Sequence, residues 1–363
     1  MDNVPARGES AASRIGWWSA DLKDLTGQAI VTSRVVALLE NIETQAFVYR
    51  GERLKSIVSW AWAALRLWAP LPARRVQVLY LVCSRSTAGF LRDLPAYATR
   101  IFGVRVLVHV HGSDIVDLCR RPGIGLVTRS ILARCELIIP SVHLLAPLRD
   151  LGMRQIHLCE NFSEYLAPVA SSPPRPAQDE LRLSVLWNSN VMASKGFYAV
   201  ADAIKSLVDE GKSIRLVVLG RPIGDEVMDL RACQRALSRI LIQGWIEYPG
   251  PVDRPTAMRL LHEADVVCLP SRYNSECQPL AVIEAMCAGR QLVIADTPAL
   301  CATVGDYPCE KVSGPVASEI TLALQHVMEQ PASGEALQFA ATHAQQRFSP
   351  ERFDRDMARL LQI

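Results

Sequence analysis

The sequence lacks three features that would define its class at once. It has no apolar run long enough to cross a bilayer, no CxxC pair among its ten cysteines, and no GxGxxG motif after a predicted strand. The first absence and a start without an apolar export segment favour a cytoplasmic protein. The second favours reduced, buried thiols and no zinc cluster. The third excludes a nicotinamide oxidoreductase of the usual dinucleotide-binding kind.

Charge is also scarce. Charged residues make up 21% of the chain and the formal net charge is +2, so we expect no nucleic-acid partner. The charge is unevenly divided, because residues 1–165 hold 20 basic and 14 acidic residues whereas the remainder holds 19 and 23. Two parts with different partners would explain this division, as would chance variation of the solvated surface.

What the sequence does contain is a regular alternation of predicted strands and helices. Short β-branched runs alternate with segments of helical periodicity, which predicts parallel sheets covered on both faces. In the first half the expected strands are 14–18, 45–49, 76–82, 105–110, 136–140 and 155–159, and the expected helices are 28–41, 53–68, 90–101 and 142–151.

Residues 166–180 interrupt this alternation with four prolines among small residues, which is typical of a linker. The alternation then resumes. We therefore predict an α/β protein of two doubly wound, Rossmann-like domains facing across a cleft, residues 1–165 and 181–345. Residues 346–363 form a final amphipathic helix with a Ser349 cap and Pro350 at its first position. It packs on its own domain or crosses back to the first.

The strongest local signal is ADVVCLPSRYNSECQPLAVIEAMCAGRQLVIAD. A buried strand leads to a loop with Glu276, and the helix that follows carries Glu284. Pro279 suits the first turn, which leaves the amides of Leu280 and Ala281 near the helix start. A helix start at the carboxyl edge of a parallel sheet is an anion site. Amides for phosphate and carboxylates for hydroxyls predict a nucleotide diphosphate ligand.

This segment resembles family 4 (GT4) retaining glycosyltransferases of the GT-B fold. The resemblance implies that Glu284 binds the ribose and that Glu276 lies beside the donor sugar. It also places Gln278, Pro279, Leu280 and Ala281 at the donor. Glu276 counts as catalytic on this interpretation.

The resemblance extends to LSVLWNSNVMASKGFYAVADAI, where Lys195 and Gly196 match the family's phosphate-binding KG. We expect Lys195 to neutralise the leaving diphosphate, with Gly196 letting amides approach it. The family usually has Arg where this chain has Asn190, and Arg221 is the candidate to replace that charge.

In the first half, DLTGQAIVTSRVVALLE resembles the family's glycine loop, which assigns Gly27 to the donor phosphates or the acceptor. LVHVHGSD resembles the strand end that carries the family's active-site histidine, here His111. We expect His109 to point to the opposite face of that strand. ELIIPSVHLLAPLRDLG with ENF resembles the end of the family's acceptor domain, and FSPERF its closing helix.

The resemblance implies transfer of a sugar from a UDP- or GDP-sugar to an acceptor hydroxyl with retention. The leaving phosphate would take the acceptor's proton, with no covalent carboxylate intermediate. We expect no cofactor and no metal, because amides and Lys195 neutralise the diphosphate and no DxD occurs in the second-half loops. The family context points to a saccharide or lipid-linked acceptor in bacterial exopolysaccharide or lipopolysaccharide assembly.

Two alternatives stay open, a non-catalytic binding subunit of the same fold and a nucleotide-sugar epimerase. A further question concerns residues 53–75, where Trp60, Trp62 and Trp68 stand between basic residues. Such a helix is typical of a membrane interface. We favour ordinary packing between strands, with peripheral contact at the inner face of the membrane as the alternative.

Overall fold

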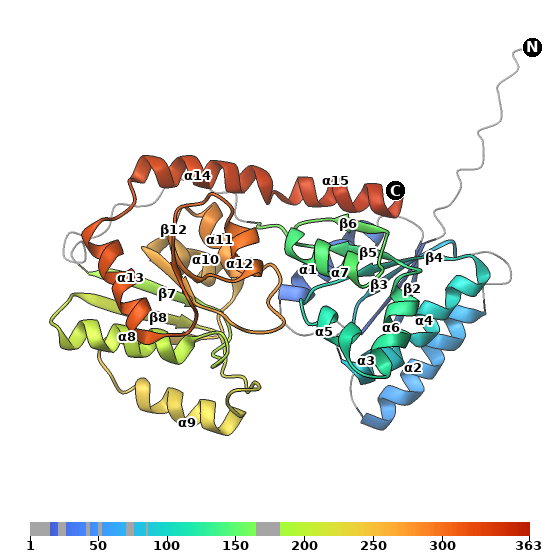
Figure 1. Cartoon of the computed structure of the whole chain (residues 1–363), viewed down its shortest axis with the longest axis horizontal. Coiled ribbons are helices and arrows are strands. Elements are labelled where there is room, and N and C mark those ends of the chain that lie inside the picture. The colour runs from blue at the N-terminus through green and yellow to red at the C-terminus, as the bar shows by residue number, and fades with distance from the viewer. Residues whose placement is uncertain are drawn as a thin grey trace, which may run out of the picture. The chain divides into compact units, whose positions relative to one another are not determined.

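The computed structural model describes residues 15–20, 27–40, 44–49, 53–69, 76–84, 86–164 and 182–363. The predicted linker at 166–180 lies outside these residues. The chain divides into two compact units, Met1–Glu160 with Phe353–Ile363, and Asn161–Arg352. Each unit is built on one six-stranded parallel sheet (Figure 1), which confirms the expected α/β class with two doubly wound sheets.

The sheet of the first unit has the strand order β2-β1-β3-β4-β5-β6. Its strands are buried apolar runs, as β3 and β5 show along almost their whole length, because helices cover both faces. The strands are β1 Ile15–Ala20, β2 Thr44–Tyr49, β3 Val78–Val82, β4 Arg105–His109, β5 Glu136–Ile139 and β6 Ile156–Leu158. The helices are α1 Gly27–Glu40, α2 Arg53–Trp68, α3 Thr87–Arg92, α4 Leu94–Ala98, η1 Thr99–Phe102, α5 Ile115–Arg120, α6 Ile124–Leu132, η2 Val142–Leu144 and α7 Leu145–Asp150.

The sheet of the second unit has the order β12-β11-β10-β7-β8-β9. Helices α8 and α13 pack side by side on one of its faces (Figure 1). The strands are β7 Leu183–Asn188, β8 Ile214–Leu219, β9 Ile246–Gly250, β10 Val266–Leu269, β11 Gln291–Ala295 and β12 Cys309–Val312. The helices are α8 Phe197–Asp209, α9 Leu230–Ile240, α10 Arg254–Glu263, α11 Leu280–Cys287, α12 Pro298–Val304, α13 Ala317–Glu329 and α14 Gly334–Arg347.

The predicted helix at 90–101 is wrong in its continuity. The structure divides it into the end of α3, then α4 and η1. Pro95 lies in the first turn of α4, and a proline there has no N–H to continue the preceding helix. The α3 C-terminus therefore closes at Asp93, whose amide donates to Gly89, and α4 starts afresh.

The last helix, α15 Pro350–Leu361, returns to the first unit with its residues from Phe353 onward. Arg34 of α1 forms a bidentate pair with Asp354, with nitrogen–oxygen distances of 2.8 and 2.5 Å. Arg105 donates to the carbonyl of Leu360 at 2.7 Å. The buried face of α15 consists of Phe353, Met357 and Leu361. The open question about this helix is thus answered in favour of the first unit.

In the described ranges no helix has the length and hydropathy to pass through a bilayer. All ten cysteines are free thiols. Eight of them are buried, and Cys301 and Cys309 are partly exposed. These eight fill apolar positions, as small hydrophobic side chains do.

A buried carboxylate joins three elements of the first unit. Asp93, fully shielded from solvent, accepts hydrogen bonds from Trp18 of β1 at 3.0 Å and Tyr49 of β2 at 3.3 Å. Ser84, just after β3, also donates to it. Arg92 lies 3.4 Å from the same carboxylate and 4.6 Å from the Tyr49 ring centroid. Burial, followed by the Asp93 charge, raises the pKa of Tyr49, so the phenol remains a donor.

We predict that Asp93→Ala lowers the free energy of unfolding of the first unit by about 3–5 kcal/mol, because buried donors then lose their acceptor. Differential scanning calorimetry would record this as an earlier melting transition. The matched control is Asp150→Ala at the exposed end of α7, which should change stability by less than about 0.5 kcal/mol. Unchanged melting of Asp93→Ala would contradict the structural role of this carboxylate.

Candidate functional site

The second sheet has a topological switch point between β7 and β10. From β7 the chain winds outward to β8 and β9, and then restarts on the other side of β7 with β10. Ligands of doubly wound sheets bind outside the carboxyl ends of the strands at such a point. The loops after β7 and β10 carry Lys195 and Glu276, and α11 after the second loop carries Glu284.

Lys195 and Glu276 form an ion pair at this edge. The ammonium nitrogen lies 3.4 Å from Oε2 of Glu276, and both side chains are largely buried, with 15% and 11% exposure. Lys195 also donates to Oγ of Ser189 at 3.1 Å. Ser271, the second residue after β10, donates to Oε2 of Glu276 at 2.8 Å. The two predicted residues are therefore in one place, and each is held by a hydroxyl at the end of a strand.

The Asp225 carboxylate fixes the loop that carries Lys195 through hydrogen bonds to the preceding residue, Ser194. Asp225 accepts from both the amide and the hydroxyl of Ser194 at 2.7 Å, and from the amides of Val227 and Met228 at 2.9 Å. These hydrogen bonds hold the pKa of Asp225 below its usual value, although burial acts in the opposite direction. The charge of Asp225 thus positions the residue next to Lys195.

Gly196 has a packing role. Its φ of +92° lies in the left-handed region, and an added Cβ would lie 2.7 Å from Cγ of Pro270. Only glycine lets α8 begin this close to the end of β10. The amide of Gly196 donates to the carbonyl of Ala193 at 2.9 Å. The N–H group of Gly196 is therefore used within its own loop.

Glu284 is buried at 3% exposure and carries its own counter-ion. Arg254, the first residue of α10, donates to Oε1 at 2.5 Å, and Asn188, the last residue of β7, donates to Oε2 at 3.1 Å. Burial raises the pKa of Glu284 above its usual value, while Arg254 and Asn188 act to lower it. The carboxylate thus depends on these partners to stay ionised.

Helix α11 begins as expected, with Pro279 as its N-cap and Leu280 as its first residue. The amides of Leu280 and Ala281 have no hydrogen-bond acceptor within the described part of the chain, which is the usual state of a first helical turn. Gln278 is committed elsewhere, because its Oε1 accepts from the amide of Asn161 at 2.7 Å and its carbonyl from the Asn161 side chain at 2.9 Å.

Asn190 and Arg221 lie on adjacent loops. The amide of Val191 donates to the carbonyl of Arg221 at 2.9 Å, and Gly220 packs against Ser189 and Asn190. Arg221 is exposed. The structure therefore places the backbone of this candidate replacement cation beside the position where the resembled family has its arginine.

His111 belongs to the first unit, two residues after the end of β4, and is partly buried. The expectation that His109 points away from it is wrong. Their ring centroids are 4.1 Å apart, because residues two apart on a strand share a face. Burial lowers the pKa of His109 to about 3, so His109 is neutral and its Nδ1 pairs with the hydroxyl of Tyr80 at 2.8 Å. Gly27 is the exposed first residue of α1.

The sequence interpretation missed the residues that hold the site together: Asn188, Ser189, Asp225, Arg254 and Ser271. For one of them a signal existed, because a glutamate inside the apolar run LAVIEAMC requires a buried partner of opposite charge. Nothing in a single sequence says which arginine supplies it. Among the residues described, no group of three or more His, Cys, Asp or Glu side chains is placed to hold a metal ion.

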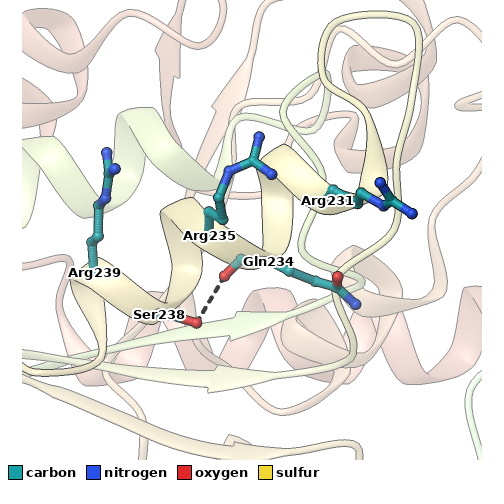
Figure 2. Close-up of a pocket in the computed structure, with 5 residues that line it drawn as sticks. All are labelled: Arg231, Gln234, Arg235, Ser238 and Arg239. Carbon is teal, nitrogen blue, oxygen red and sulfur yellow. Dashed lines mark hydrogen bonds between the residues drawn. The ribbon is translucent and has the colours of Figure 1, made fainter.

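A surface hollow lies away from these residues. Its volume is about 390 Å³. Figure 2 shows the α9 residues that line it, Arg231, Gln234, Arg235, Ser238 and Arg239. The hydroxyl of Ser238 donates to the carbonyl of Gln234 at 2.9 Å. None of the predicted site residues lines this hollow, so we place the candidate site at the sheet edge and not here.

Known proteins resemble this chain in sequence over part of its length and in structure over almost all of it. Residues 182–323 match the model of the family described as "Glycosyl transferases group 1", a range that contains Lys195, Glu276 and Glu284. The match identifies this part of the chain as a glycosyltransferase domain and the protein as an enzyme of that class. No curated protein sequence matches the chain.

Solved structures match almost the whole chain. HepE of Anabaena, in complex with UDP and glucose, shares 14% identity at a TM-score of 0.72, over 96% of this chain and 99% of its own. Sucrose-phosphate synthase of Thermosynechococcus elongatus shares 17% identity at a TM-score of 0.73, over 96% of this chain and 98% of its own. A UDP-forming trehalose-phosphate synthase of Burkholderia xenovorans, in complex with glucose-6-phosphate, shares 14% identity at a TM-score of 0.62, over 85% of this chain and 78% of its own. These likenesses show the GT-B fold.

We predict that Arg254→Ala lowers the free energy of unfolding by about 2–3 kcal/mol at pH 8. This is less than for a fully buried pair, because the Arg254 side chain keeps 34% exposure. Without Arg254 the already raised pKa of Glu284 rises further, so at lower pH the folded state takes up a proton that relieves the unpaired charge. The stability deficit should therefore shrink from pH 8 to pH 5, as thermal melts at both values would show.

Arg259→Ala is the matched control on the same helix. Its side chain is 61% exposed and pairs with exposed Glu263, so the change should stay below about 0.5 kcal/mol at both pH values. If the deficit of Arg254→Ala is the same at pH 5 and pH 8, the Glu284 carboxylate does not depend on Arg254 for its charge.

Proposed function

We propose that the protein transfers a sugar with retention from a nucleotide-diphosphate sugar, UDP or GDP, to an acceptor hydroxyl, as a family 4 glycosyltransferase. The observation that carries the proposal is the Lys195–Glu276 pair at the switch point of the second sheet. A helix start lies in the same loop connection. A UDP donor is favoured, because the similar HepE structure holds UDP and glucose.

In this proposal the leaving diphosphate lies against Lys195 and the amides of Leu280 and Ala281. An ammonium has three N–H donors, and the Lys195 ammonium contacts Ser189 and Glu276. A diphosphate oxygen would take over part of this contact. Preorganised donors aimed at developing negative charge are usually the largest single contribution to such catalysis. Arg221 adds a second cation in place of Asn190.

The two glutamates have separate tasks in this proposal. Glu276 orients the sugar and stabilises positive charge that develops on its ring. Glu284 accepts the ribose hydroxyls. Arg254 and Asn188 each donate to one carboxylate oxygen of Glu284. The remaining lone pairs of these two oxygens would receive the ribose donors. The ion pair thus keeps Glu284 charged and fixed before the nucleotide arrives.

Proton transfer needs no protein base in this mechanism. The acceptor hydroxyl attacks the anomeric carbon on the face that the diphosphate leaves, and a phosphate oxygen takes its proton. His111 binds sugar or acceptor hydroxyls. No covalent carboxylate intermediate forms, unlike in retaining hydrolases. We propose that the reaction proceeds without a metal, since Lys195 and the α11 amides supply the positive charge.

The proposed acceptor is a saccharide, in particular a lipid-linked saccharide of bacterial exopolysaccharide or lipopolysaccharide assembly at the inner face of the membrane. The excess of basic residues in the first 165 positions supports this acceptor, because lipid-linked substrates lie in anionic membranes. A structurally similar synthase holds the soluble sugar glucose-6-phosphate, so a soluble acceptor is the comparison to include in any assay.

We predict that UDP-sugars stabilise the protein more than GDP- or ADP-sugars. A ligand at one hundred times its Kd adds about 2.7 kcal/mol, which a thermal-shift screen detects. Transfer additionally requires that donor turnover depends on an added acceptor. Turnover of the sugar without acceptor would indicate an epimerase, and binding without any turnover would indicate a binding subunit. No stabilisation by any of the three would contradict the proposed donor class.

We further predict that Lys195→Ala lowers turnover by about 100-fold or more, the loss expected when one preorganised donor to a developing anion is removed. The measurement is the initial rate of nucleotide release at saturating donor. The matched control is Lys205→Ala in the helix that follows, whose side chain is 52% exposed and pairs with Asp209; its rate should equal that of the wild type. An equal rate in both variants would remove Lys195 from the site.

A further inference from the structure

Helix α2 exposes an apolar face to solvent. Ile57, Val58, Trp62 and Leu65 are 64%, 70%, 61% and 60% exposed. With Ala61, which is also exposed, they follow the spacing of one helical stripe. A surface helix usually turns such a stripe inward, so this exposed face requires an explanation.

The opposite face of α2 is firmly seated on the first unit. Ala63 and Leu67 are buried. The indole nitrogen of Trp60 donates to the carbonyl of Arg92 at 2.8 Å, and that of Trp68 to the carbonyl of Pro95 at 3.1 Å. Ordinary packing, the favoured interpretation from sequence, therefore explains one face of the helix only. Packing between strands does not account for Trp62, which lies on the exposed face.

The apolar surface continues beyond α2. The ring of Trp68 lies edge-on to that of Phe102 in η1, with centroids 5.5 Å apart. Phe102 is 44% exposed and Ile101, beside it, 81%. In Figure 1, α2 lies along the outside of the first unit next to α4. We call the residues Ile57, Val58, Trp62, Leu65, Trp68, Ile101 and Phe102 the α2 patch.

The chain around the α2 patch is strongly basic. Residues 53–113 contain nine Lys or Arg and a single acidic residue, Asp93, which is buried and hydrogen-bonded. On α2 itself Arg66 is exposed next to Leu65 of the apolar stripe. This is the arrangement of an interfacial helix, with apolar residues including Trp beside cations.

We propose that the α2 patch docks the protein on an anionic lipid bilayer, with α2 lying in the plane of the interface. The apolar side chains enter the boundary between head groups and acyl chains, and the basic residues contact lipid phosphates. This inference goes beyond the proposed reaction and stands without it, because docking requires neither donor nor acceptor.

Charge decides between a bilayer and a second copy of this chain. A two-fold dimer through the α2 patch would bring the same surface of each copy together. It would bring two copies of a strongly basic segment together, since residues 53–113 contain nine Lys or Arg and a single acid, the buried Asp93. An anionic membrane supplies the missing negative charge.

The test is flotation of the full-length protein with vesicles of phosphatidylcholine alone or with added phosphatidylglycerol, an anionic lipid that gives the vesicle a negative surface potential. We expect binding to the anionic vesicles only, weakening as salt increases. The double variant Trp62→Gln and Leu65→Gln should bind about tenfold more weakly or worse. Both positions are exposed, so its melting temperature should match that of the wild type.

Leu322→Gln is the matched control, since Leu322 is an equally exposed leucine, at 66%, on α13 of the second unit. It should bind as the wild type does. In a second measurement, brominated lipid should quench wild-type tryptophan fluorescence, and Trp62→Leu should retain binding but lose the part of that quenching that Trp68 does not supply. Absence of wild-type binding to anionic vesicles would overturn the proposal. So would equal losses in the control, or a concentration-dependent dimer that the double variant abolishes without any vesicle binding.

Because donor stabilisation is measured without vesicles, the two proposals fail separately. A protein that binds anionic vesicles but no nucleotide sugar would retain the docking surface and lose the proposed reaction. A protein that binds UDP-sugar but no vesicle would retain the reaction and lose the docking surface.

Discussion

Two consecutive residues at the end of β7 hold the candidate site together. Asn188 donates to Glu284, and Ser189 accepts from Lys195. Lys195 in turn pairs with Glu276. Because β7 and β10 are neighbouring parallel strands, both of their carboxyl ends open at the same edge. The three charged residues therefore depend on the strand order of this sheet for their proximity.

The charged groups at that edge are paired within the protein itself. Lys195 is opposed by Glu276, and Glu284 by Arg254. Isolated charges at such low exposure would cost several kcal/mol each. The pairing allows the site to keep its charged groups buried, and it fixes their positions through hydroxyls and an amide. In the proposed reaction, a diphosphate would replace one partner of Lys195 and would not meet an unpaired cation.

The sequence predicted the parts of this arrangement that depend on local pattern. Buried strands, the helix start at Pro279 and the loop positions of Lys195 and Glu276 all follow from hydrophobic periodicity and backbone chemistry. The sequence could not supply the partners. Arg254 is thirty residues from Glu284 in the chain, and Asp225 is thirty-one from Ser194, so only the fold pairs them.

Two predictions from sequence patterns, the continuous helix at 90–101 and the opposite faces of His109 and His111, are wrong. Residues 90–101 have helical periodicity throughout, yet Pro95 divides them because it cannot continue the hydrogen-bond ladder. His109 and His111 were assigned to opposite faces, although two residues along a strand is a full period and their rings are in contact. For α2 the periodicity predicts the helix correctly but does not say which face is buried. Apolar residues on the buried face and on the exposed face contribute equally to the helical pattern. Solvent exposure distinguishes the two kinds of residue. The buried Leu67 stabilises the fold, whereas the exposed Leu65 belongs to the proposed membrane-docking surface.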